Sequence, residues 1–134
     1  MILLDTVVLS ELRKSRPSPK VLAWLKKQRA EQLFISVVSL GEIERDIVKV
    51  HKSDAAFAAS LANWLEDTML LYCDHILPVS AAIARRWGRL SAELGHEGAD
   101  LLIAATALEH SLTVATRNVR HFKPSGVALV NPFS

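Results

Sequence analysis

The sequence predicts an α/β protein with a mostly parallel central sheet of about five strands, flanked by helices. Three observations predict this class: short continuous apolar runs recur, sequence of helical period separates them, and half of the 134 residues are hydrophobic. Short runs without polar alternation are typical of strands buried on both faces, as in parallel sheets. The charged fraction of 22% excludes intrinsic disorder, and the length predicts a single domain over residues 1–134.

The predicted strands follow one another along the chain as Ile2–Leu4, Gln32–Ile35, His75–Leu77, Leu112–Ala115 and Val127–Val130. Between them, apolar residues recur at spacings of three and four, which indicates amphipathic helices. Pro17 and Pro19 precede the second helix, and Gly95 and Gly98 bracket a turn between two later helices. Strands that alternate with helices favour parallel pairing, so their carboxyl ends share the edge of the sheet where ligands bind.

Composition argues against several classes of protein. The densest apolar stretch, Leu101–Leu108, is eight residues long, whereas a membrane span needs about 18 or more. A lone Cys73 cannot form an internal disulfide, and Asp5 interrupts the apolar start of the chain, so we expect no signal peptide and a cytoplasmic location. We expect Cys73 itself to be at least half-buried. The five histidines lack zinc-ligand spacing, and no glycine pattern matches a nucleotide-binding loop.

Three acidic residues are positioned to meet at the carboxyl edge of the predicted sheet. Asp5 ends the first strand, Glu42 lies seven residues beyond the second strand, and Asp100 begins an apolar helix. Asn118, two residues past Thr116, adds an uncharged oxygen at the same edge. Carboxylates that converge repel one another unless a cation balances them, so this cluster predicts a hard divalent metal.

Each of these acids also has a local alternative role. Asp5 and Asp100 each stand where an N-cap of the following helix is expected. Ser39 and Glu42 match the S-x-x-E capping box, in which the glutamate bonds back to the backbone. For any one residue both interpretations stay open, whereas three acids at one edge are harder to explain by capping alone.

Four segments resemble, in order, the signature blocks of PIN-domain toxins of the VapC and FitB type. The blocks are Met1–Thr6 with Leu9–Leu12, Ile35–Ile43, Ala99–Ala107 and Leu112–Asn118, and the terminal Val130–Phe133 is also similar. The resemblance implies a PIN-like domain that hydrolyses RNA phosphodiester bonds as the toxin of a type II toxin–antitoxin pair. It implies that Asp5, Glu42 and Asp100 are the catalytic residues and hold Mg²⁺ or Mn²⁺. It also implies a homodimer and a small antitoxin partner.

Further residues receive supporting roles under this hypothesis. Those expected to orient the carboxylates or the metal's waters are Thr6, Ser39, Thr116 and Asn118. Those expected to contact RNA phosphates are Arg117, Arg120, Arg85 and Arg86. The chain departs from the family pattern at Val7, where an asparagine is usual, and at Asn118 and His121, where aspartate is frequent.

Two other functions are compatible with parts of this sequence. A catalytically weak PIN-like interaction module, acting through its dimer and partner surfaces, is motivated by Val7 and Asn118. A phospho-acceptor receiver domain also has aspartates at strand ends. However, Asp5 has no acidic neighbour, and Asn131 follows the fifth strand where a receiver has lysine.

Two tryptophans suggest how a partner could bind. Trp24 and Trp64 lie in the apolar stripes of the second and fourth predicted helices. These helices are predicted to form a groove for an amphipathic segment of the antitoxin. The alternative is ordinary core packing.

Overall fold

The computed structural model describes all 134 residues and confirms the predicted α/β class. The strands are β1 (Ile2–Leu4), β2 (Leu33–Ser36), β3 (Ile76–Leu77), β4 (Thr113–Ala115) and β5 (Leu129–Val130). All four strand pairings are parallel, and the order across the sheet is β3-β2-β1-β4-β5. Because β1 is the central strand, its carboxyl end lies in the middle of the sheet edge.

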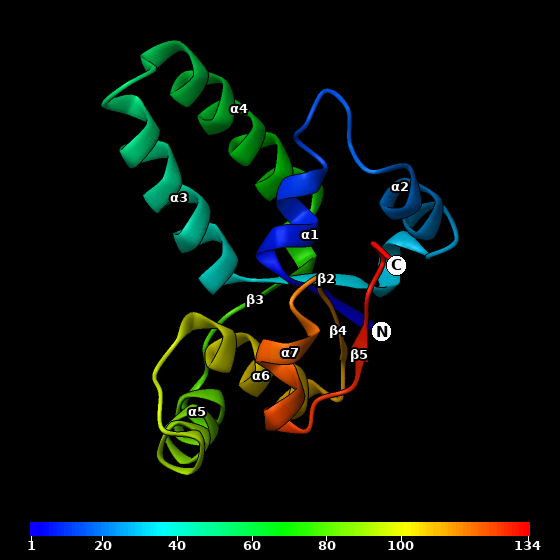
Figure 1. Cartoon of the computed structure of the whole chain (residues 1–134), viewed down its shortest axis with the longest axis vertical. Helices are drawn as coiled ribbons and strands as arrows, with labels where there is room; N and C mark the ends of the chain where they lie inside the picture. Colours follow the sequence, from blue (N-terminus) through cyan, green and yellow to red (C-terminus); the bar gives the residue numbers. More distant parts are fainter.

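Helices connect the strands and cover both faces of the sheet (Figure 1). They are α1 (Thr6–Glu11), α2 (Pro19–Lys26), α3 (Val37–His51), α4 (Ala55–Leu71), α5 (Ala81–Leu94), α6 (Ala99–His110) and α7 (Val119–Phe122). Short 3₁₀ turns are η1 (Ala30–Gln32), η2 (Cys73–His75) and η3 (Lys123–Ser125). Helices α1–α4 lie on one side of the sheet and α5–α7 on the other, and α3 and α4 form a long hairpin that extends away from it (Figure 1).

A separate hydrophobic core fills each face. Leu4 and Ile35 pack with α1–α4, whereas Leu3 and Val114 pack with α6 and α7. Successive strand residues point to opposite faces, so a strand covered on both sides must be apolar throughout. This explains the continuous apolar run at the start of the chain. None of the helices is both long enough and apolar enough to cross a bilayer.

Two details differ from the sequence-based expectation. Cys73 is exposed, so the prediction that it is at least half-buried was wrong. It lies in η2, next to β3, which is the outermost strand on that side of the sheet. His75, predicted to begin a strand, belongs to the same 3₁₀ turn, and its ring stacks on Phe34 with centroids 4.6 Å apart.

Candidate active site

Asp5 lies at the centre of the sheet edge, where β1 ends and α1 begins. Its backbone N–H donates to Ala115 O at 2.9 Å, which continues the β1–β4 ladder by one residue. One carboxylate oxygen, Oδ1, accepts from Thr6 N at 2.8 Å, and the other, Oδ2, accepts from Thr116 Oγ1 at 2.7 Å. Asp5 is therefore the N-cap of α1, as the local alternative proposed. Each carboxylate oxygen of Asp5 has two lone pairs and accepts one of these two hydrogen bonds, so each oxygen can still accept a further bond or bind a cation.

Glu42 comes from the second turn of α3 and faces α1. Its Oε1 is 2.7 Å from Thr6 Oγ1, which is also 2.8 Å from Ser39 Oγ. A hydroxyl carries one proton and a carboxylate only accepts, so Thr6 donates to Glu42 and Ser39 donates to Thr6. On the solvent side, Arg45 Nη2 lies 3.8 Å from Glu42 Oε2.

The predicted capping box at Ser39 and Glu42 was wrong. Ser36, the last residue of β2, is the N-cap of α3, and its Oγ accepts from Val38 N at 3.0 Å. The helix therefore begins before Ser39 and carries both predicted box residues inside it. Their side chains are free to meet Thr6 instead of the backbone.

Asp100 is in the first turn of α6 but is not its N-cap, so that alternative was also wrong. The helix begins at Ala99 after Gly98, which has no side chain to cap it. A carboxylate in a first turn is favoured by the helix dipole. The Asp100 side chain is directed toward His121, whose Nδ1 is 3.2 Å from Asp100 Oδ2.

The three acids line one cleft of about 250 Å³. Burial raises the pKa of Asp5 to about 6, the hydrogen bonds from Thr116 and Thr6 oppose this, and the negative charges of Asp100 and Glu42 add to it. The carboxylates thus act on one another electrostatically. As the side chains stand, no three acidic, histidine or cysteine residues surround one point closely enough to ligate a single ion.

The cleft has further polar residues, one of which sequence reasoning missed. Asn118 lines it, and its backbone N–H donates to Thr116 Oγ1 at 2.9 Å, while its side chain makes no capping bond to α7. Asp46 lines the cleft as well. It lies four residues after Glu42, hence on the same face of α3, and this spacing is the signal that could have identified it. Val7 contributes an apolar wall.

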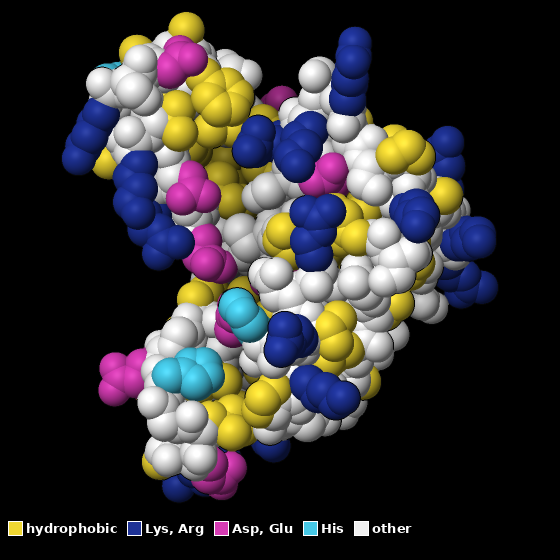
Figure 2. All heavy atoms as spheres, viewed as in Figure 1, with side chains coloured by type: hydrophobic (Ala, Val, Ile, Leu, Met, Phe, Trp, Pro, Cys, Tyr) yellow, Lys and Arg dark blue, Asp and Glu magenta, His cyan; other side chains and the backbone are white.

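The cleft continues into a hollow of about 570 Å³ that shares Glu42 and Asp100 with it. Arg120 and Arg45 line this hollow together with His121. Seen from outside, Lys and Arg side chains gather over α1 and α7 beside the notch below the α3–α4 hairpin (Figure 2). Positive charge therefore adjoins the acidic cleft.

Arg85 and Arg86, predicted to contact RNA at the site, are not brought to the cleft. Arg86 Nε pairs with Glu109 Oε2 at 2.6 Å. Glu109 is near the carboxyl end of α6, whereas Asp100 is at the amino end of the same helix. Helices α5 and α6 are joined by the tight turn at Gly95–Gly98, so the first half of α5 lies at the end of α6 remote from the cleft.

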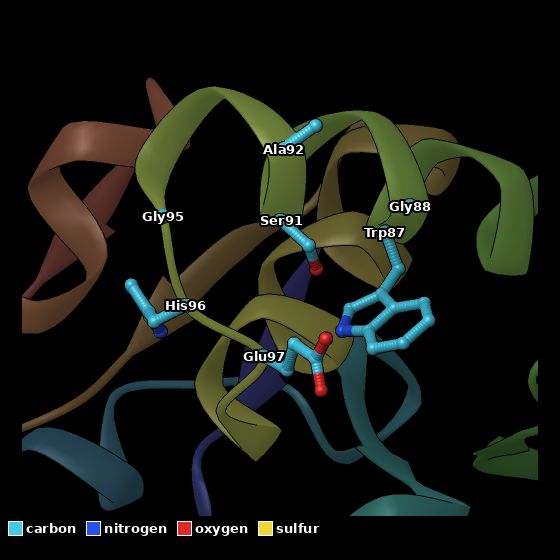
Figure 3. A pocket seen from close by; sticks show the side chains of 7 residues that line it. All are labelled: Trp87, Gly88, Ser91, Ala92, Gly95, His96 and Glu97. Atoms are coloured by element: carbon cyan, nitrogen blue, oxygen red, sulfur yellow. The ribbon is translucent and has the colours of Figure 1, made fainter.

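A larger hollow of about 660 Å³ borders the turn between α5 and α6. Trp87 Nε1 and Ser91 Oγ are buried there without hydrogen-bond partners. Figure 3 shows both atoms directed to the side on which Glu97 lies. Glu97 is the only acidic residue that lines this larger hollow. The three predicted carboxylates line the smaller cleft instead.

A groove of about 400 Å³ runs between α1 and the α3–α4 hairpin. Phe57 and Leu61 of α4 line it, whereas Trp24 and Trp64 are partly buried against the core. Neither tryptophan lines a hollow of the protein, so the structure does not show the predicted groove between the second and fourth helices, and the groove present lies between α1, α3 and α4 instead. It shares Ser10 and Asp46 with the acidic cleft.

Known proteins resemble this chain over its whole length. The family model described as PIN domain matches residues 2–125. The chain is 33% identical to a VapC ribonuclease of Sinorhizobium fredii, with 99% of this chain and 98% of that protein covered. It is 34% identical to the toxin FitB of Neisseria gonorrhoeae, with 99% of each covered. A chain in the crystal structure of FitAcB from Neisseria gonorrhoeae superposes with a TM-score of 0.87 at 34% identity, covering 99% of both chains. A chain in the structure of FitAB bound to a DNA fragment superposes with a TM-score of 0.85 at 33% identity, covering 100% of this chain and 96% of that one.

Proposed function

The chain belongs to the PIN-domain family, and from that premise we propose that it is a metal-dependent endoribonuclease, the toxin of a type II toxin–antitoxin pair. One observation carries the proposal. Asp5, Glu42 and Asp100, which come from three separate segments, line one cleft at the carboxyl edge of the sheet. The full-length similarity to a VapC ribonuclease and to the toxin FitB supports it.

The donor set suits a hard divalent cation such as Mg²⁺ or Mn²⁺. The three acids supply oxygen ligands only, which these cations prefer. The raised pKa of Asp5, due first to burial and then to its acidic neighbours, reports negative charge that the protein leaves unbalanced. A bound cation would offset that charge and hold all three carboxylates ionised at neutral pH. Asp5, Glu42 and Asp100 are the residues that would hold it.

A divalent ion, when bound, lowers the pKa of a coordinated water and offsets charge on the scissile phosphate. The residues of the chain orient the carboxylates and bind the RNA. Thr116 and the backbone of Thr6 fix both oxygens of Asp5. The Ser39–Thr6 relay fixes Glu42. Arg120, in the adjoining hollow, supplies positive charge for the RNA backbone.

The groove beside α1 suits the antitoxin. It combines the apolar Phe57 and Leu61 with the charged Arg13 and Lys49, as an amphipathic segment requires. Because the groove opens into the acidic cleft, a segment bound there would block access of RNA to the carboxylates. A small antitoxin, a homodimeric toxin and a cytoplasmic location complete the proposal.

RNA cleavage in Mg²⁺, with and without a chelator, tests the activity. We expect Asp5→Asn and Asp100→Asn each to reduce the rate at least ~100-fold, the scale of losing a metal's charge stabilisation. Asp74→Asn, a matched change in η2 outside the cleft, should leave the rate unchanged. Circular dichroism confirms that each variant is folded. Full cleavage by both cleft variants, or cleavage insensitive to the chelator, would overturn the proposal.

A weakly catalytic interaction module is the second candidate, and Val7 favours it. This side chain lines the cleft as an apolar group beside the carboxylates, where a polar residue would support them. Val7→Asn distinguishes the two functions. A nuclease gains activity from the added amide, whereas an interaction module binds its partner equally well before and after the change and cleaves RNA in neither form.

A further inference from the structure

Arg117 and Phe133 form a stacked pair where β4 and β5 end, at the sheet edge that carries the acidic cleft, although neither side chain lines the cleft itself. The guanidinium carbon of Arg117 lies 4.1 Å from the centroid of the Phe133 ring, a close cation–π distance. Arg117 is exposed and takes part in none of the salt bridges of the protein. One face of the guanidinium is thus covered by the ring, while the side chain as a whole is exposed and its charge also acts on the carboxylate of Glu11.

Strand register places this pair at the same edge of the sheet as the carboxylates. Ala115 of β4 pairs with Val130 of β5, and Thr116 N donates to Val130 O at 3.0 Å. Thr116 is also the hydrogen-bond partner of Asp5, so Arg117 is one residue beyond a direct contact of the central carboxylate. Phe133 follows β5 after a turn in which its N–H donates to Asn131 Oδ1 at 2.9 Å. Both members of the pair therefore stand on the ends of neighbouring strands.

Stacking on Phe133 holds the Arg117 guanidinium in one orientation, which an unsupported surface arginine does not have. A flat guanidinium held on an aromatic ring loses little further freedom when a second planar group stacks on it. Unpaired RNA bases stack on arginine planes and on aromatic rings, and such stacking is largely independent of sequence. A phosphate contact needs only positive charge. Arg120, which has no aromatic partner and lines the hollow beside Asp100, fits that simpler role.

We infer that Arg117, supported by Phe133, is the platform on which one unpaired base of a single-stranded RNA stacks beside the scissile phosphate. The inference rests on the proposed ribonuclease function, because it names how that cleft recognises its substrate. A base held there fixes the adjoining backbone over the carboxylates. It also makes single-stranded segments, rather than duplexes, the substrate.

Binding without cleavage tests this inference separately from the activity. Full-length protein carrying Asp5→Asn is titrated into a fluorescein-labelled single-stranded RNA, and the anisotropy gives the Kd. In this background Arg117→Lys should weaken binding about tenfold, nearly as much as Arg117→Ala, because lysine keeps the charge but cannot stack. Arg89→Lys, the matched control at an exposed position of α5 outside the cleft, should change the Kd less than about twofold. Phe133→Leu should weaken binding in the same direction as Arg117→Lys, with circular dichroism confirming the fold.

A spectroscopic measurement reports the stack itself. RNAs with 2-aminopurine at successive positions should show one position whose fluorescence is quenched on binding, and Arg117→Lys should abolish that quenching. Binding by Arg117→Lys equal to that of the parent, quenching that survives the change, or no binding of single-stranded RNA by the parent would overturn the inference. The nuclease function is judged independently, by cleavage assays of the unmodified chain with and without a chelator and by comparison with Asp100→Asn. Metal-dependent cleavage together with normal binding by Arg117→Lys would reject the platform alone.

Discussion

Thr116 Oγ1 donates a 2.7 Å hydrogen bond to Asp5 Oδ2, and this bond joins the ends of β4 and β1 across 111 residues of sequence. Both residues are buried, with exposed fractions of 0% for Thr116 and 4% for Asp5. The bond lowers the pKa of Asp5 against the stronger effect of burial. Thr116 therefore favours the ionised form of Asp5, which is the form that binds a cation.

Thr116→Val should move the pH dependence of cleavage to higher pH. Valine has nearly the shape of threonine but donates no hydrogen bond, so the pKa of Asp5 rises and less of it is ionised at pH 7. A hydrogen bond to a charged group is worth about 1.5–3 kcal/mol, so the ionised fraction of Asp5, and with it the rate at pH 7, should fall about two- to tenfold. Rates measured between pH 5 and 9 test this. Thr116→Ser, which keeps the hydroxyl, should restore the profile, and a profile unchanged in Thr116→Val would contradict the role of Thr116.

Asp5→Asn should stabilise the metal-free protein at alkaline pH. The pKa of Asp5 is raised from 3.8 to about 6 in the folded chain, so the folded state binds the proton more tightly than the unfolded state. The stability that this provides is present below pH 4 and is lost as the pH rises through 6. Above pH 7 the ionised carboxylate opposes folding by at most about 3 kcal/mol, a penalty that asparagine removes while still capping α1.

Urea unfolding with a chelator at pH 5 and pH 8 measures this effect. The variant should have the larger free energy of unfolding at pH 8, and its advantage should shrink at pH 5. Adding Mg²⁺ at pH 8 should stabilise the unmodified chain more than the variant, because only the carboxylate gains from the cation. An advantage of equal size at both pH values would show that Asp5 is not the titrating group.

Much of this fold could be predicted because its signals are local. Each of the five strands is a short apolar run, and burial on both faces leaves no other pattern available to it. Asp5 could be predicted as a site residue for the same reason, since the end of β1 is visible in the sequence. The exact ends were less predictable. They depend on partner strands, which is why Val127 precedes β5 instead of beginning it.

The parts of the site that could not be predicted depend on how helices and strands are placed relative to one another. The capping box at Ser39 failed because Ser36 serves as both the last residue of β2 and the cap of α3, without an intervening loop. Arg86 lies away from the cleft, paired with Glu109, because α5 runs back along α6, and that direction is not visible in the sequence. Asp46 was missed because an exposed acid on a helix, taken alone, looks the same in sequence whether it faces a cleft or bulk water, and only its spacing of four from Glu42 distinguishes it.

Ser36→Ala should destabilise the protein by about 1 kcal/mol, the usual effect of removing an N-cap. Ser36 Oγ accepts from Val38 N at the start of the helix that carries Glu42. Ser53→Ala is the matched control, because Ser53 is exposed and donates only a 3.3 Å bond to Val50 O at the end of the same helix. It should change the unfolding free energy by less than about 0.5 kcal/mol. Equal effects of the two changes in urea unfolding would contradict the assignment of the cap.

Asp46→Asn should weaken the response to Mg²⁺ without abolishing cleavage. Asp46 lines the cleft but is exposed, so water and salt screen its charge. We expect the Mg²⁺ concentration for half-maximal cleavage to rise about two- to threefold, far less than the effect of losing a ligand. Glu44→Gln, an exposed change on the same helix outside the cleft, is the control. A loss of activity as large as that of Asp5→Asn would instead make Asp46 a direct ligand.

Asn118→Asp should have the opposite effect and lower the Mg²⁺ concentration required for half-maximal cleavage. Asn118 lines the cleft with Asp5 and Asp100, and its side chain makes no hydrogen bond that the change would break. Asparagine and aspartate have nearly the same shape and are equally good N-caps, so α7 should begin at the same residue. The carboxylates of Asp5, Glu42 and Asp100 supply a charge of −3, and the substitution raises it to −4, which strengthens binding of a divalent cation by about three- to tenfold. Asn63→Asp, on the exposed side of α4, adds the same charge away from the cleft and should leave the titration unchanged. If the Mg²⁺ titrations of Asn118→Asp and the unmodified chain coincide, then Asn118 does not face the bound cation, and its side chain is part of the cleft wall only.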